Sequence, residues 1–123
     1  MLCNEAGLHE FGPDRPVSGF AFGDELAPGV TAIEVGAICP EETCLHIDVG
    51  DGMLAFADAL IRYEDLPRFV SDGLLGDDPE EVKAGLREAF ERLLELHFAD
   101  LLFAHGDPLL GEGRQALVTL AGV

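Results

Sequence analysis

Basic residues are scarce in this sequence, which has 7 Lys and Arg against 24 Asp and Glu and a formal net charge of −17 over 123 residues. Such an acidic surface repels nucleic-acid phosphates and anionic lipid headgroups, so we expect neither a nucleic acid nor a membrane as partner. The chain also lacks any apolar run near the ~20 residues that a membrane-spanning helix needs. These absences favour a soluble protein.

The features of a secreted protein are missing as well. The chain begins Met1-Leu2-Cys3-Asn4, without the basic and then apolar segments of a secretory signal, and we expect a cytoplasmic location. Its cysteines, Cys3, Cys39 and Cys44, are odd in number and have no CxxC spacing. They indicate reduced thiols rather than a zinc knuckle or a disulfide framework.

Several catalytic and nucleotide-binding motifs are absent. Ser18 and Ser71 lie outside any GxSxG sequence, which leaves a serine triad unsupported. The glycine-rich stretches do not match GxxxxGK[ST], and no GxGxxG joins a strand to a helix. Hydrolysis by an activated serine and nucleotide binding through these motifs are therefore not indicated.

The length of 123 residues fits one domain spanning 1–123, and its 48% hydrophobic residues are enough for a packed core. Gly and Pro interrupt residues 1–29 so often that we expect a loop-rich N-terminal segment with one short strand within that domain. No internal repeat divides the chain.

The remaining pattern predicts alternating strands and helices. Apolar or alternating runs bounded by turn residues predict strands over 30–35, 44–49, 53–57 and 101–104, and residues 61–78 are expected to be loop-like. Alternation in the second strand puts one set on the core face, Leu45, Ile47 and Val49, and another on the opposite face, Cys44, His46 and Asp48. The fold class is α/β (α+β), a mixed β-sheet flanked by helices.

Two helices complete this pattern. A cap at Asp78 with Pro79 at the first helical position starts a helix that runs to about Leu96. Its apolar positions follow helical spacing and predict one core stripe, formed by Val82, Leu86, Ala89, Phe90, Leu93, Leu94 and His97. A short last helix is expected over 114–120.

Two of the strands end in side chains that can bind a metal ion. Asp58 follows the strand over 53–57, and His105 follows the strand over 101–104. An oxygen and a nitrogen donor at a sheet edge suit zinc, iron or manganese. A stable site needs about four donors, and the others would come from a second chain, a nearby acid, or His9, Glu10, His46 or Cys39.

Plainer roles compete at these positions. His105 also fits a hydrogen-bonded residue that caps a strand, and His9 fits an exposed loop histidine. Three acidic residues near the first helix are better explained by capping than by cation binding, namely Asp72, Asp77 and Asp78.

Three segments in order give the sequence a resemblance to a known family. They are Met53-Leu54-Ala55-Phe56-Ala57-Asp58-Ala59-Leu60, Phe69-Val70-Ser71-Asp72-Gly73-Leu74-Leu75-Gly76-Asp77-Asp78-Pro79 and Leu101-Leu102-Phe103-Ala104-His105-Gly106-Asp107-Pro108. From about Val30 to Leu120 the chain resembles the C-terminal half of metallo-β-lactamase-fold hydrolases. The resemblance implies half of an αββα sandwich, with Asp58 at the position of a ligand that bridges two metals and His105 at that of a ligand to the second metal.

The resemblance also implies what is missing. The HxHxDH motif of this family, which supplies most ligands of the first metal, does not occur in the chain, and the family's Gly-His-Thr-Pro-Gly is replaced by Gly36-Ala37-Ile38-Cys39-Pro40-Glu41. We therefore expect a truncated or degenerate metal-dependent hydrolase with an incomplete metal site. A half fold exposes an apolar sheet face, which predicts a homo-oligomer or a companion chain that covers the sheet.

Two other functions stay open. One is an active metal-dependent hydrolase of the ester or thioester class, whose ligand set is completed by a homodimer or a second chain. The other is a non-enzymatic acidic interaction module. No pattern in the sequence identifies the small-molecule substrate of an enzyme with this fold, because loops select it.

Overall fold

The computed structural model describes residues 2–5, 18–39, 42–57, 59–63, 66–69 and 77–122. Its main layer is a five-stranded sheet in the order β3-β4-β5-β6-β9. The strands from β3 to β6 are antiparallel to their neighbours, and β9 runs parallel to β6. Their bounds are β3 (Glu25–Ala27), β4 (Val30–Glu34), β5 (Thr43–Ile47), β6 (Met53–Phe56) and β9 (Asp100–Phe103). The prediction of a mixed sheet is confirmed.

Two small sheets accompany the main one, and the sequence prediction missed most of them. The strands β1 (Leu2–Asn4) and β2 (Ser18–Phe20) pair in parallel, so three short strands lie within 1–29 where one was expected. The strands β7 (Ile61–Tyr63) and β8 (Leu66–Arg68) form a hairpin in a segment expected to be a loop. Pro67 in β8 argued against a strand, but a two-stranded sheet has only edge strands, where proline is tolerated.

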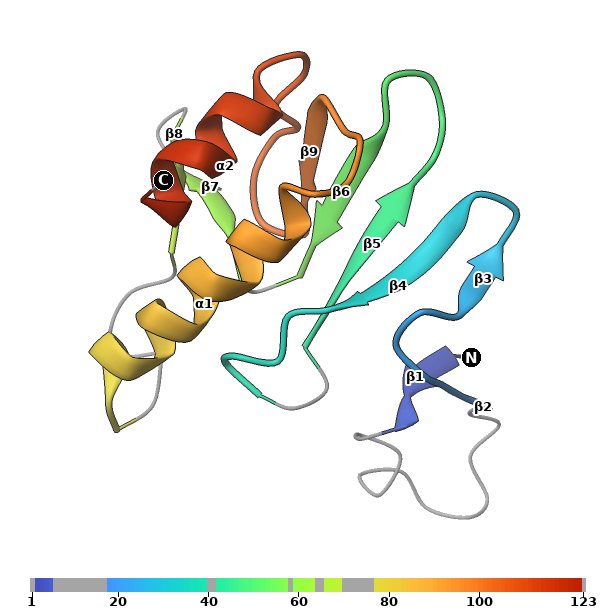
Figure 1. The fold of residues 1–123 in the computed structure, drawn as a ribbon, viewed down its shortest axis with the longest axis horizontal. Helices are drawn as coiled ribbons and strands as arrows, with labels where there is room; N and C mark the ends of the chain where they lie inside the picture. Colours follow the sequence, from blue (N-terminus) through green and yellow to red (C-terminus); the bar gives the residue numbers. More distant parts are fainter. Residues whose placement is uncertain are drawn as a thin grey trace.

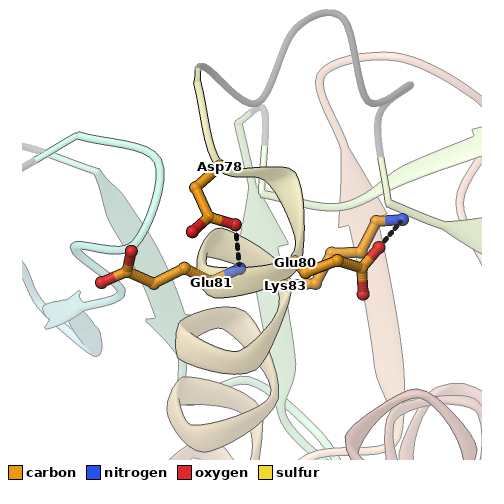
Figure 2. A network of polar contacts seen from close by, with 4 residues as sticks. All are labelled: Asp78, Glu80, Glu81 and Lys83. Carbon is orange, nitrogen blue, oxygen red and sulfur yellow. Dashed lines mark hydrogen bonds and ion pairs between the residues drawn. The ribbon is translucent and has the colours of Figure 1, made fainter.

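The helix α1 (Pro79–Leu93) begins where the sequence predicted. The Asp78 carboxylate accepts a hydrogen bond of 3.2 Å from the backbone N–H of Glu81, and Pro79 starts the helix (Figure 2). The figure also shows the ion pair of the half-buried Lys83 with the exposed Glu80, whose 3.5 Å contact at the surface contributes little to stability. The helix ends before the expected Leu96, and His97 is exposed rather than part of the core stripe.

The hydrophobic core lies between the sheet and its two helices, α1 and α2 (Gly113–Ala121), which pack together on the same side of the sheet (Figure 1). Phe90 of α1 is fully buried, and its ring meets Phe56 of β6 edge-on at 5.8 Å between centroids. The predicted stripe on α1 is confirmed at its buried positions, which are Leu86, Ala89, Phe90 and Leu93. No helix in the described part of the chain is long and apolar enough to cross a membrane.

The predicted inner face of β5 is wrong. Cys44 is fully buried and pairs with Phe56 of β6, so it faces the helices, whereas Leu45 and Ile47 are half-buried and Val49 is 58% exposed. Strand alternation identified two faces correctly but could not tell which one the helices cover. The sequence analysis assigned the more apolar set to the core, namely Leu45, Ile47 and Val49. The thiol of Cys44 packs in the core instead.

The opposite face of the sheet is therefore apolar without being part of the core. Its apolar side chains alternate with the helix-facing ones along β4, β5, β6 and β9, and none of them belongs to the core cluster. Apart from the fully buried Ala32, they are half-buried. These residues, which we call the second sheet face, are Val30, Ala32, Leu45, Ile47, Met53, Ala55 and Leu102.

Two matched leucine substitutions test this assignment of faces. Leu54→Ala leaves a cavity beneath the helices and is expected to lower the free energy of unfolding by about 2–5 kcal/mol. Leu45→Ala, in the neighbouring strand on the second sheet face, is expected to cost about 1 kcal/mol because its side chain is already part-exposed. Urea unfolding followed by circular dichroism measures both, and equal losses would contradict the assignment.

Candidate functional site

The parallel pairing of β6 with β9 brings the ends of the two strands that precede the predicted ligand positions to one edge of the sheet. Phe56, the last residue of β6, pairs with Phe103, the last of β9, and the Ala104 N–H donates to the Phe56 C=O at 3.0 Å. Asp58 and His105 each come two residues after these strand ends. Asp58 itself lies outside the described residues, and its described neighbours are the exposed Ala57 and the buried Ala59.

His105 lies in the turn that follows β9. Its side chain is exposed to solvent, and its backbone C=O accepts a hydrogen bond of 3.0 Å from the Arg62 N–H of β7. The turn that carries His105 therefore lies beside the segment that follows Asp58 in the chain. The His105 side chain therefore lies at the protein surface.

Glu42, which the sequence analysis did not single out, lies at the same edge just before β5. It is 7% exposed, and its Oε1 accepts a buried hydrogen bond of 3.0 Å from the Ala59 N–H. Its Oε2 lies 4.0 Å from the Cys39 Sγ. The carboxyl group thus ties the β4–β5 connection to the residue that follows Asp58. A single acidic residue before a strand carries no sequence signal for such a role.

Cys39 and Cys44 have different environments. Cys44 is fully buried, and this burial raises the pKa of its thiol far above the usual range, with a smaller contribution from the nearby Glu42. It is therefore protonated at neutral pH and unsuited to bind a metal. Cys39 is half-buried beside Glu42, at the edge where Asp58 and His105 follow their strands.

The other candidate ligands that the structure describes do not join this edge. His46 lies on the helix-covered face, with its Nε2 2.8 Å from the backbone C=O of His97 beyond α1. Asp77 and Asp78 lie at the start of α1, where Asp78 caps the helix. His9, Glu10 and Asp72 lie outside the described residues. Within the ranges that the structure describes, no three His, Cys, Asp or Glu side chains are grouped to hold a metal ion.

Substitution of Glu42 tests its contact with Ala59. Glu42→Ala leaves the buried Ala59 N–H without its acceptor and is expected to lower the free energy of unfolding by about 1–3 kcal/mol. Glu42→Gln keeps a carbonyl oxygen for this hydrogen bond and is expected to lose less than half as much. Urea unfolding measures the free energy of unfolding of both variants. A larger loss in Glu42→Gln than in Glu42→Ala would show that the hydrogen bond to Ala59 does not account for the contribution of Glu42 to stability.

Comparison with known proteins finds similarity at the level of structure. No family model and no curated protein matches the sequence. Two variants of a flavo di-iron protein from Thermotoga maritima superpose with TM-scores of 0.64 and 0.63, each at 17% identity. Rubredoxin:oxygen oxidoreductase from Desulfovibrio gigas superposes with a TM-score of 0.61 at 16% identity.

The extent of these matches defines which part of a larger fold the chain represents. The alignments cover 98% of this chain but 35%, 34% and 36% of the three matched chains, so the chain spans about a third of their length. The five-stranded sheet and two helices correspond to part of an αββα arrangement, as the sequence resemblance implied. The chain therefore has a partial metallo-β-lactamase-like fold.

Proposed function

We propose that this chain is a metallo-β-lactamase-like domain with an incomplete metal site, a degenerate relative of metal-dependent hydrolases. The observation that carries the proposal is the parallel pairing of β6 with β9, because it brings the segments that lead into Asp58 and His105 to the same sheet edge. The fold agrees with the ordered motifs, whereas most of the ligands that the family resemblance implies are missing from the sequence.

The number and chemical type of the ligand atoms determine which metal ion this site could bind and how tightly. Asp58 and His105 offer one carboxylate and one imidazole, which suit a divalent transition-metal ion. Two donors support only weak binding completed by water, since a firmly held ion needs about four ligands. The residues present do not fit a dinuclear centre, and activation of water at neutral pH requires an ion that is firmly held. The chain alone is thus not an efficient hydrolase.

The identity of the ion is a separate question. Zinc, iron and manganese all accept mixed oxygen and nitrogen ligands. Two of the structural neighbours are named as di-iron proteins, which adds weight to iron among the three. Iron(II) under anaerobic conditions therefore belongs beside zinc and manganese in any binding experiment.

A metal titration of the purified chain tests this proposal. We expect weak binding, with a Kd no tighter than about 10 µM, and no ester or thioester turnover, because Asp58 and His105 together supply only two donors. His105→Ala is expected to weaken binding at least tenfold, and His97→Ala serves as a matched control because this exposed histidine lies outside the proposed site. Tight stoichiometric metal with turnover would contradict the degenerate site, and unchanged binding in His105→Ala would exclude His105 as a ligand.

A second candidate function is an active metal-dependent hydrolase whose ligand set is completed by another chain. The observation that favours it is the second sheet face, whose seven apolar residues lie outside the core cluster. Burial of such a face by a second copy or a companion chain is a common source of assembly. The net charge of −17 opposes self-association, which favours a companion chain of less acidic composition.

Mass measurement in solution tests the assembly. Light scattering after size-exclusion chromatography is expected to give more than the 13.1 kDa of one chain, either alone or with a co-purified companion. Leu45→Lys places a charge on the second sheet face and is expected to release the monomer, whereas the surface change Glu88→Lys should not. A stable 13.1 kDa monomer without metal would contradict the assembly and, with it, this second candidate function.

A further inference from the structure

Arg62 of β7 contacts most of the turn that carries His105. Its backbone N–H donates to the His105 C=O at 3.0 Å. Its Nη1 donates to the C=O of Asp107 at 3.3 Å and to that of Pro108. One residue thus supplies the donors for three carbonyl groups of a four-residue turn, from a position four residues after Asp58.

Gly106 shows how closely this turn approaches Arg62. Its φ is +120°, and a Cβ built on it would lie 2.3 Å from the Arg62 carbonyl oxygen. No side chain can occupy that space without moving one of the two backbones. Backbone contact and side-chain hydrogen bonds therefore act together to hold the turn against β7.

The guanidinium of Arg62 has no ionic partner within the described residues. Its Nε is buried without a hydrogen-bond acceptor there, which costs about 1–3 kcal/mol. Removal of this side chain thus loses two hydrogen bonds but also removes an unpaired buried donor. The two effects oppose each other, so the contribution of Arg62 to global stability is small compared with its effect on the turn.

We propose that Arg62 is the positioning residue that holds the His105 turn against β7, the strand that follows Asp58 in the chain. The proposal rests on the proposed function, in which these two residues are the remaining ligand positions. Two described residues near position 58 make hydrogen bonds, Phe56 with the Ala104 N–H and Ala59 with the Glu42 carboxylate. Arg62 provides the corresponding attachment to the His105 turn.

Paramagnetic broadening by Mn²⁺ of amide signals in the ¹⁵N-labelled chain tests the proposal. In the wild type an ion shared by both positions broadens the amides of Ala57, Ala59 and His105 together, because the effect falls steeply with distance. Arg62→Met is expected to need at least tenfold more Mn²⁺ for the same joint broadening. Loss of a positive charge alone would strengthen cation binding, so a weaker response cannot arise from charge.

Two further variants separate positioning from a general loss of structure. Arg62→Lys keeps a donor that can reach the turn carbonyls and is expected to restore Mn²⁺ broadening to within about threefold of the wild type. Arg114→Met is the matched control, because Arg114 also donates to two backbone carbonyls, those of Leu94 and Leu96 after α1. It should leave the Mn²⁺ response of the three amides unchanged.

Hydrogen exchange distinguishes a failure of the proposed role of Arg62 from a failure of the proposed function. The amide at position 62 remains in Arg62→Met and reports its bond to the His105 C=O, so its exchange should accelerate at least tenfold while the core amide of Leu54 keeps its rate. An unchanged rate at position 62, or an unchanged Mn²⁺ response, would overturn the role of Arg62. Absence of broadening in the wild type would instead contradict the shared site and, with it, the proposed function.

Discussion

The pairing of β6 with β9 is the interaction on which the rest of this structure depends. It is the only parallel pair among the described strands of the main sheet, and α1 lies in the connection between its two strands. Because parallel strands end at the same edge, the register from Met53–Asp100 to Phe56–Phe103 brings the segments after them together. Leu54 and Leu101 lie on the buried side of the same pair, and the two helices pack on that side.

The elements with strong local signals could be predicted from the sequence. The capping carboxylate of Asp78 and the proline after it located the start of α1, and the Gly-bounded β4 was predicted to within one residue. The β7–β8 hairpin was missed because Pro67 is a weak strand former whose acceptance depends on the pairing partner. The face of β5 was reversed because alternation defines two faces without showing which one meets α1.

The candidate site could be predicted only in part, for a related reason. The strand ends before Asp58 and His105 are visible as local patterns. The sequence also shows that the ligand motifs of the family are absent. Glu42 and Arg62 act through contacts with distant backbone groups, the Ala59 N–H and the carbonyl groups of the His105 turn. Such contacts depend on tertiary structure and leave no trace in composition or spacing. Sequence patterns therefore do not identify Glu42 and Arg62, whose contacts fix the backbone near the candidate site.

The connection between β6 and β9 also has a consequence for the order of folding. The antiparallel strands β4, β5 and β6 pair with their neighbours in the chain across short connections, and such local contacts form early. The edge shared by β6 and β9 is complete only after a long intervening segment has been ordered and its loop-closure entropy has been lost. We therefore expect the candidate site to form in a late, non-local step and to be one of the first features lost when the domain is destabilised.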